Sequence, residues 1–299
     1  MELTKSQVRM VLGVFPTGSR ITDWNHFQRE YLPAPIRVTV RTPAGKIQSV
    51  VIRLARHGSV EDEARLLGVL AKLGLPVPEL LSSPVIDPEI SSHPVIALYS
   101  LLPGINLQKL SERSAKDCRL AARLVVHATT RLAELTGSLR SCRETDFLPS
   151  FSLTDELNQI VSAGGPWLHM KIFLEAVSTL KPMLAEESED PVFTGGDNQP
   201  GNFMTDGKKV TGYLDFEMAG YRDFLFGFAK YPIYDLHPLN KAGMIDTLLA
   251  ETGYSVREFQ IRLALGCLST LQREISTNGP DSKYRNHVIG LLSHSLNSL

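Results

Sequence analysis

One segment of 29 residues most constrains what this chain can fold into, because it interrupts a long helical pattern. Residues 192–220 read VFTGGDNQPGNFMTDGKKVTGYLDFEMAG. They indicate a short strand, a Gly-Gly-Asp loop, and two β-type runs on either side of Asp206 and Gly207. An Asp-Gly dipeptide between two such runs is a strong signal for a β-hairpin. We therefore predict a hairpin with strands over 202–205 and 210–214.

This hairpin is expected to bring three oxygen-bearing side chains together: Asp197, Asn202 and Asp215. Hard cations such as Mg²⁺ prefer oxygen ligands, and one carboxylate with one amide carbonyl suffices when nucleotide phosphates supply the rest. Phosphoryl transfer needs one further carboxylate to orient the attacking hydroxyl and accept its proton. The alternative is that Asp197 and Asn202 only form turns and Asp215 only caps an element. The three residues together, with a hydrophobic strand before each Asp, favour phosphoryl-transfer chemistry.

The rest of the chain divides into a mixed part and a helical part. The first third predicts a helix over 5–12 capped by Thr4, strands over 36–41 and 48–54, a helix over 60–73 and a strand over 93–101. Helical spacing of Leu, Ala and Val then predicts helices over 115–139, 153–162, 167–184, 241–252, 255–276 and 282–299. Pro103 and Gly104 mark the boundary, so we expect an α+β protein with lobes over 1–102 and 103–299.

Composition excludes several classes of protein. The 299 residues are 43% hydrophobic and carry a net charge of −1, which argues against a strongly basic nucleic-acid binder and a polybasic membrane-surface protein. Three scattered cysteines give no zinc spacing and suit a reducing compartment. The N-terminus carries Lys5 and Arg9 where a signal peptide would be apolar, and no run of about 18 apolar residues occurs. We expect a soluble cytoplasmic protein with no nucleic-acid or membrane partner.

The segment 192–220 resembles the aminoglycoside phosphotransferase / choline kinase-like family, small-molecule kinases that share the protein-kinase fold. The family signature is His-Gly-Asp-x-x-x-x-Asn, followed by a hydrophobic strand that ends in Asp-Trp/Phe-Glu. Here residues 195–202 read GGDNQPGN and residues 213–217 read YLDFE. The resemblance implies a bilobal fold with a small β-rich N-terminal lobe and a larger, mainly helical C-terminal lobe. It also implies that Asp197 is the catalytic base and that Asn202 and Asp215 hold Mg²⁺.

The resemblance extends to the N-terminal part. Residues 50–54 (VVIRL) are similar to the family's third strand, which places Arg53 where a cation contacts the nucleotide phosphates. The following helix implies that Glu63 pairs with this cation, with Glu61 as the alternative. Residues 97–104 (ALYSLLPG) resemble the segment between the lobes, whose backbone near Ser100 and Leu102 would bind the adenine edge.

Several positions depart from the family pattern. Gly195 and Gln199 stand where the family commonly has His, and Gly227 stands where an Asp usually braces the catalytic loop. The phosphate-covering loop is expected between a first strand near 24–30 and Ile36. Residues 31–35 there read YLPAP and contain no glycine, although glycine lets backbone amides approach phosphates.

These observations lead to one function and one alternative. We expect an ATP-dependent enzyme that transfers the γ-phosphate, with Mg²⁺, to a hydroxyl of a small molecule, with GTP as the other candidate donor. The acceptor classes left open are an antibiotic such as an aminoglycoside, and a sugar or amino-alcohol metabolite. Residues 106–299 carry 20 Lys and Arg against 23 Asp and Glu, which is only weakly acidic for binding a polycation. The alternative is a catalytically impaired kinase-like protein that binds nucleotide or metabolite in a regulatory role. The sequence leaves the oligomeric state open.

Overall fold

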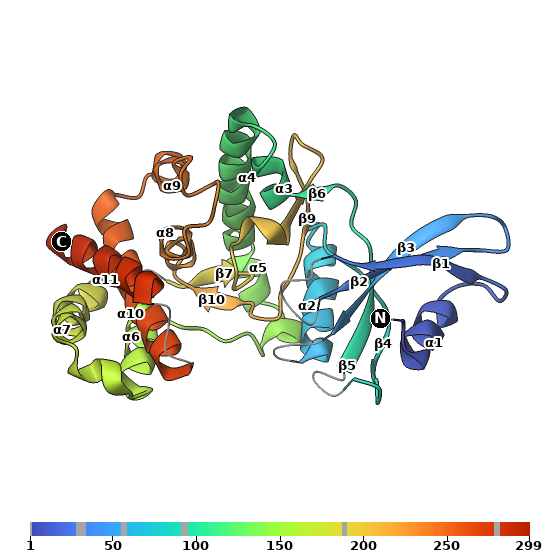
Figure 1. Ribbon diagram of the computed structural model, residues 1–299, viewed down its shortest axis with the longest axis horizontal. Helices are drawn as coiled ribbons and strands as arrows, with labels where there is room; N and C mark the ends of the chain where they lie inside the picture. The colour runs from blue at the N-terminus through green and yellow to red at the C-terminus, as the bar shows by residue number, and fades with distance from the viewer. Residues whose placement is uncertain (1, 28–33, 55–58, 91–94, 187–189, 278–281) are drawn as a thin grey trace. The chain divides into compact units, whose positions relative to one another are not determined.

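The computed structural model describes residues 2–27, 34–54, 59–90, 95–186, 190–277 and 282–299. The chain forms two compact units (Figure 1). The first comprises Met1–Ile105, Cys142–Phe147 and Phe203–Met218, and the second comprises Asn106–Ser141, Leu148–Asn202 and Ala219–Leu299.

A five-stranded antiparallel sheet forms the centre of the first unit. In spatial order its strands are β1 (Arg20–His26), β2 (Ile36–Arg41), β3 (Ile47–Leu54), β5 (Val95–Ser100) and β4 (Leu80–Ile86). A turn joins β2 and β3, and Gly45 takes a φ of +79° there. Such a left-handed conformation favours glycine, because it has no Cβ to clash with the backbone.

Two helices belong to this sheet unit. Helix α1 (Lys5–Gly13) is capped by Thr4, which exchanges hydrogen bonds with Gln7 in a capping box. Its Met10 and Val11 pack in one apolar cluster with sheet residues from β2, β3 and β5. Helix α2 (Val60–Lys72) is capped by Ser59 and buries the carboxylate-bearing Glu63 beside its Leu residues. The packing of α2 therefore places a charged side chain in a buried position.

The predicted hairpin is present and also belongs to the first unit. Strands β8 (Phe203–Thr205) and β9 (Val210–Tyr213) pair antiparallel, in a small sheet with β6 (Ile105–Asn106). Asp206 Oδ1 accepts hydrogen bonds from the backbone amides of Lys208 and Lys209 and thereby closes the turn. Phe203 pairs with Tyr213, so the chain enters and leaves the hairpin at the same end.

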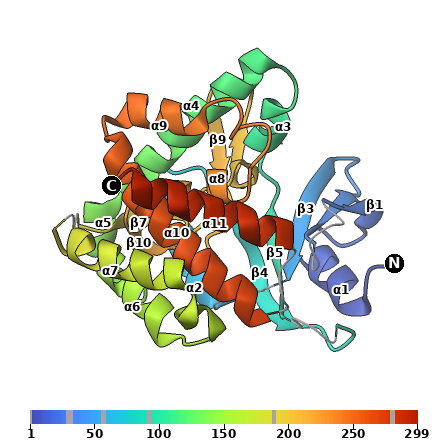
Figure 2. The ribbon, with the colours of Figure 1, turned by 60° about the vertical axis from the view of Figure 1, so that its left-hand side comes forward.

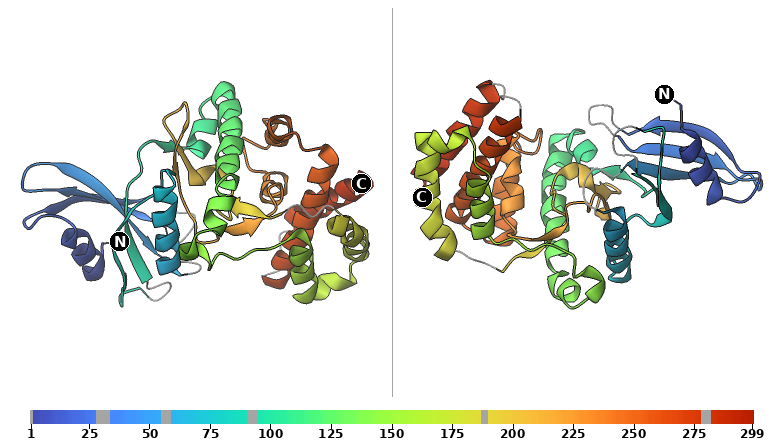
Figure 3. Two further views of the ribbon diagram at one scale, coloured as in Figure 1. Left: turned by 180° about the vertical axis from the view of Figure 1, so that it is seen from behind. Right: turned by 90° about the horizontal axis from the view of Figure 1, so that it is seen from below.

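The second unit is mainly helical. Its helices are α3 (Leu107–Ser111), α4 (Ala115–Ala133), α5 (Thr136–Arg140), α6 (Leu153–Ser162), α7 (Lys171–Glu186), α8 (Lys230–Ile233), α9 (Met244–Thr252), α10 (Val256–Thr277) and α11 (Ser282–Asn297). Helices α10 and α11 lie side by side (Figures 2 and 3). A short antiparallel pair, β7 (Val192–Thr194) and β10 (Gly220–Arg222), precedes and follows the residues of the hairpin in the sequence. Among the described residues, no helix has both the length and the apolar content needed to cross a membrane.

Some helix boundaries differ from the prediction. The expected helix over 115–139 is broken between α4 and α5, where the Thr136 hydroxyl donates to Ala133 O and accepts the backbone amide of Phe193. This contact ties the break to β7. The expected helix over 241–252 begins only at Met244, because Gly243 before it has a φ of +79°. The predicted helix over 167–184 begins at Lys171, after a 3₁₀ turn.

Two strand predictions also need correction. The first strand runs over Arg20–His26 and not near 24–30, of which 28–30 lie outside the described residues. The sequence pattern missed β4, whose LLSSPVI contains two serines and a proline, residues that disfavour strands. Its pairing with β5 is irregular in register, so the packing of the sheet and not local propensity makes this segment a strand.

Candidate active site

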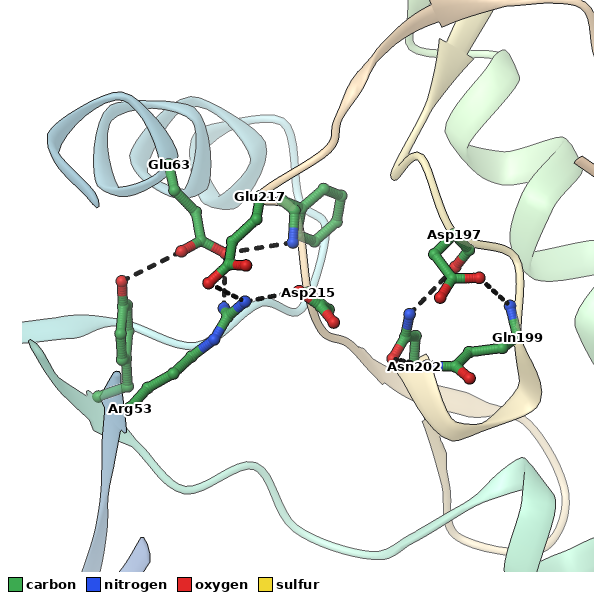
Figure 4. Close-up of polar contacts among 9 residues, drawn as sticks. Arg53, Glu63, Asp197, Gln199, Asn202, Asp215 and Glu217 are labelled. Carbon is green, nitrogen blue, oxygen red and sulfur yellow. Dashed lines mark hydrogen bonds and ion pairs between the residues drawn. The ribbon is translucent and has the colours of Figure 1, made fainter. Parts of the chain in front are cut away.

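An ion-pair cluster in the first unit is centred on Arg53, near the end of β3. Its Nη1 lies 2.7 Å from Glu63 Oε1 on α2, and its Nη2 lies 2.5 Å from Asp215 Oδ1 and 2.9 Å from Glu217 Oε1 (Figure 4). Asp215 and Glu217 follow β9, so the hairpin delivers both carboxylates to the guanidinium. One cation therefore binds three carboxylates from two distant parts of the sequence.

Glu63 is the buried anchor of this cluster, with 4% of its side chain exposed. Its Oε1 also accepts the backbone amide of Phe216 at 3.1 Å, and its Oε2 accepts the hydroxyl of Tyr99 at 3.4 Å. Burial raises the pKa of Glu63, and the guanidinium of Arg53 opposes that rise. Burial together with the Glu63 charge also raises the pKa of Tyr99, which keeps its hydroxyl a donor. Glu63 thus joins α2, β3, β5 and the segment after β9.

Arg53 keeps its positive charge among these carboxylates. Burial alone would lower the pKa of Arg53, but Glu63, Asp215 and Glu217 together raise it above its ordinary value. Arg53 therefore stays charged and binds all three carboxylates. Asp215 has a φ of +62°, a left-handed conformation that costs a non-glycine residue about 1–3 kcal/mol. Strain of this kind is typical of functional positions.

The ion pair between Arg53 and Glu63 was predicted, and the structure contains it. Glu61, the alternative, accepts instead from the Ser59 hydroxyl. The role of Arg53 and Glu63 toward a nucleotide stays a prediction. Glu217 was missed as a partner of Arg53, although it is the last residue of the quoted Asp-Phe-Glu sequence and could have been found there.

A second group of candidate residues lies in the loop after β7 in the second unit. Asp197 Oδ1 accepts the backbone amide of Gln199 at 3.3 Å, and the Asp197 carbonyl accepts Asn202 Nδ2 at 3.1 Å. Asn202 Oδ1 accepts Gln199 Nε2 at 3.3 Å (Figure 4). Asn202 lies in a 3₁₀ turn and not at the start of the strand as predicted. These bonds bring Asp197 and Asn202 together and fix which atom of the Asn202 amide is the acceptor.

Lys230 on α8 forms an ion pair with Asp197 Oδ1 that sequence reasoning missed. The side chains of Lys230 and Asp197 are 24% and 30% exposed, so the pair is partly desolvated but open to solvent. Burial, with a smaller contribution from Arg273, lowers the pKa of Lys230 to about 8, so its ammonium is charged at neutral pH. No pattern in the sequence pointed to this residue, because α8 is a four-residue helix with no motif.

The loop is braced by the segment around α8. Asn198 is buried, its carbonyl accepts the hydroxyl of Tyr231 at 2.9 Å, and its side chain packs on Gly227. A Cβ at position 227 would lie 2.5 Å from Asn198 Nδ2. The Asn198 amide therefore fills the space that a residue larger than glycine would need at position 227.

A buried ion pair also stabilises the segment that precedes α8. Arg262 Nη2 lies 3.0 Å from Asp223 Oδ2, with 1% and 5% of the two side chains exposed. Asp223 Oδ1 also accepts the backbone amide of Phe226 at 2.8 Å. Since Asp223 precedes Gly227 and α8, this pair fixes the segment that contacts the loop.

The remaining predicted positions concern nucleotide binding. The backbone amide of Ser100 donates to Glu79 O at 2.9 Å, and the Ser100 hydroxyl accepts the amide of Glu79, so both groups are used within the first unit. Leu102 packs its side chain against Gly212 of β9. Binding of an adenine by these two residues stays a prediction. Residues 31–33 of the predicted phosphate-covering loop lie outside the described residues.

The donor atoms present fit a hard divalent cation. Asn202 of the second unit offers an oriented amide oxygen, and Asp215 of the first unit offers a carboxylate. Oxygen donors of these two kinds suit Mg²⁺, which keeps several waters and takes its remaining ligands from phosphates. Within the described part of the chain, no group of three or more His, Cys, Asp or Glu side chains is arranged as a complete metal site. A cation bound by either side chain would therefore depend on oxygens of its substrate.

Comparison with known proteins identifies the family. The model of the phosphotransferase enzyme family matches residues 37–251, a range that contains Arg53, Glu63, Asp197, Asn202 and Asp215. A comparison with curated protein sequences finds no match.

Solved structures share the fold. The aminoglycoside phosphotransferase APH(4)-Ia is 13% identical, with a TM-score of 0.69 and 97% of each chain covered. A thermostable mutant of it, in a ternary complex with ADP and hygromycin B, has a TM-score of 0.67 at 12% identity, covering 93% of this chain and 94% of that one. The GDP complex of aminoglycoside 2'-phosphotransferase-IIIa has a TM-score of 0.62 at 15% identity, covering 98% of each chain. These likenesses confirm the predicted α+β, protein-kinase-like fold, with its β-rich N-terminal and helical C-terminal parts. The chain belongs to the phosphotransferase enzyme family, as a small-molecule kinase whose acceptor group is a hydroxyl.

Proposed function

We propose that this protein transfers the γ-phosphate of ATP to a hydroxyl of a small molecule, with Asp197 as the catalytic base. The observation that carries the proposal is the loop after β7, in which Asn202 Nδ2 is bonded to the Asp197 carbonyl and the Asp197 carboxylate is 30% exposed. A carboxylate in such a position orients an acceptor hydroxyl by accepting its hydrogen bond and takes its proton as the phosphoryl group transfers.

Asn202 and Asp215 are the proposed Mg²⁺ ligands. The oriented amide of Asn202 and the carboxylate of Asp215 support this assignment. So does the hairpin register, since Asn202 directly precedes Phe203 and Asp215 follows its partner Tyr213 by two residues. Mg²⁺ supplies neutralisation of phosphate charge in reactions of this kind.

Arg53, positioned by Glu63, is the proposed contact for the nucleotide phosphates. The ion pair with the buried Glu63 carboxylate at 2.7 Å supports this role, because it holds a permanently charged, fork-shaped donor in one orientation. The backbone near Ser100 and Leu102 is the proposed contact for the base. The ADP and GDP complexes of structural neighbours support a purine nucleotide as donor, with ATP as our first choice and GTP as the second.

The acceptor is a small molecule with a free hydroxyl. Neighbouring structures in complex with hygromycin B and with kanamycin support an antibiotic acceptor as one class. A sugar or amino-alcohol metabolite is the other class that we retain from the sequence.

The test is formation of nucleoside diphosphate by the purified protein with ATP or GTP, Mg²⁺ and a panel of hydroxyl acceptors. We expect acceptor-dependent ADP formation that EDTA abolishes. Thermal stabilisation by ATP, with no transfer to any acceptor of the panel, would contradict the proposal and favour the alternative of an impaired kinase-like protein that binds nucleotide.

A further inference from the structure

The side chain in contact with Asp197 limits which groups an acceptor can place beside this carboxylate. Lys230 contacts Asp197 Oδ1, and neither side chain is fully buried. A hydroxyl that hydrogen-bonds to the Asp197 carboxylate must lie within a few ångströms of the same carboxylate oxygens. The acceptor therefore places its neighbouring groups beside the Lys230 ammonium.

Arg273 adds a second cation on the same side of α8. The backbone amide of Tyr234 bonds to Lys230 O at 2.9 Å, one helical turn away, so Lys230 and Tyr234 project from one face. Arg273 Nη2 donates to the hydroxyl of Tyr234 at 2.8 Å. Its charge also acts on Lys230, since it contributes to the lowered pKa of that lysine. Lys230 thus contacts the Asp197 loop, and Arg273 from α10 is bonded one helical turn further along α8.

Helix α11, which packs on α8, also carries basic side chains. His287 Nε2 lies 2.9 Å from Pro232 O on α8. The sequence of α11, SKYRNHVIGLLSHSLN, contains Lys283, Arg285 and two histidines and no Asp or Glu. Asp235, just after α8, accepts a hydrogen bond from Asn240 at 2.8 Å. Helix α11 thus adds basic side chains, and no acidic ones, to the elements that pack on α8.

We propose that Lys230 and Arg273 form a cationic subsite beside the Asp197 carboxylate that binds an anionic group, a carboxylate or a phosphate, on the acceptor. This inference rests on the proposed function, because it assumes that Asp197 binds the acceptor hydroxyl. The anionic group of the acceptor replaces Asp197 as the ion-pair partner of the Lys230 ammonium. The Asp197 carboxylate can then accept the hydrogen bond of the acceptor hydroxyl. A polycationic aminoglycoside meets like charge at the same place, which is unfavourable in a partly desolvated site.

The test compares acceptors in pairs in which one member carries an anionic group and the other is neutral: glycerate against glyceramide, gluconate against gluconamide, and a sugar phosphate against its free sugar, with kanamycin as the polycation. We expect kcat/KM for the anionic member to exceed that for its neutral partner by about tenfold or more, the effect of one charge-assisted hydrogen bond. Kanamycin is expected to be the poorest acceptor.

Variants then assign the preference to residues. Lys230→Gln and Arg273→Gln are each expected to reduce the anionic-to-neutral ratio by about tenfold. Lys230→Arg, which keeps the positive charge, is expected to retain the anionic-to-neutral ratio of the wild-type protein. Lys171→Gln is the control, because Lys171 lies on α7 with a side chain that is 91% exposed. Loss of turnover by Lys230→Gln that is equal for both members of a pair would assign Lys230 a positioning role alone and overturn the inference.

The outcomes separate this inference from the function on which it rests. Equal or better use of neutral or polycationic acceptors by the wild-type protein would overturn the cationic subsite and leave the kinase activity standing. Failure to phosphorylate any member of any pair, with ATP bound, would overturn both.

Discussion

Arg53 and Asp215 form an ion pair with 2.5 Å between Nη2 and Oδ1, although 162 residues separate them in the sequence. The same guanidinium binds Glu63, so α2 and the segment after the hairpin are both oriented by one side chain. In this arrangement the proposed phosphate-binding cation and a proposed metal ligand belong to one electrostatic cluster. A change in any member alters the charge that a nucleotide and its metal ion meet.

The first prediction concerns the buried partner of Arg53. Glu63→Gln keeps the shape of the side chain but removes the charge that fixes the guanidinium. We expect kcat/KM for ATP to fall by about tenfold, the usual effect of losing a charge-assisted hydrogen bond, and mainly through KM. Steady-state kinetics with varied ATP check this. Glu61→Gln, two residues away on the same helix, is the control and should change kcat/KM by less than about twofold.

The second prediction concerns metal-dependent binding. Asp215→Asn removes a carboxylate but keeps a residue that tolerates the observed left-handed backbone. We expect ADP or ATP to lose most of the affinity that Mg²⁺ adds, as measured by calorimetric titration with and without Mg²⁺. Asp235→Asn is the matched control, since Asp235 also has a positive φ, of 44°. Unchanged Mg²⁺ dependence in Asp215→Asn would remove Asp215 from the metal site.

The third prediction concerns the packing that holds the loop with Asp197 in place. Gly227→Ala brings a Cβ within 2.5 Å of the Asn198 amide, so Asn198 must move. Overpacking of this kind destabilises a fold by about 1–3 kcal/mol, and the shifted loop should also lower kcat. Urea unfolding and turnover measure the two effects. Gly137→Ala on α5, where a Cβ meets nothing within 4 Å, should lower neither stability nor turnover. Equal behaviour of the two variants would contradict the proposed packing.

The fourth prediction concerns the buried ion pair that supports α8. Arg262→Met leaves Asp223 buried without its cation, which typically costs about 3–5 kcal/mol of unfolding free energy. The exposed pair of Lys171 and Glu175 provides the comparison, and Lys171→Met should cost no more than about 0.5 kcal/mol. Urea unfolding of both variants gives the two values. A small loss in Arg262→Met would mean that this pair does not hold the segment before α8.

The parts of the fold and site that sequence reasoning predicted are governed by local signals. Asp206 and Gly207 define the hairpin because their turn conformation is set by their own side chains and backbone. Thr4 and Gln7 define the start of α1 in the same way. The ion pair of Arg53 and Glu63 followed from the resemblance, which gave their positions on a strand and the next helix.

The parts that were missed depend on tertiary packing. Lys230 meets Asp197 only after α8 packs beside the loop, and no short-range pattern encodes that contact. The space at Gly227 became interpretable only when the Asn198 amide was located next to it. The β4 strand exists because β5 offers an edge to pair with, despite a sequence with weak strand propensity.

The most direct test of the catalytic assignment is phosphate transfer by Asp197→Asn. Asparagine keeps an acceptor for the Gln199 amide but cannot take a proton, so we expect the rate of transfer to fall by about a hundredfold to ten-thousandfold with ATP affinity retained. Asp206→Asn, a change of the same kind in the hairpin turn, should transfer at nearly the wild-type rate. Transfer by Asp197→Asn at the wild-type rate would show that Asp197 is not the base and would contradict the mechanism proposed here.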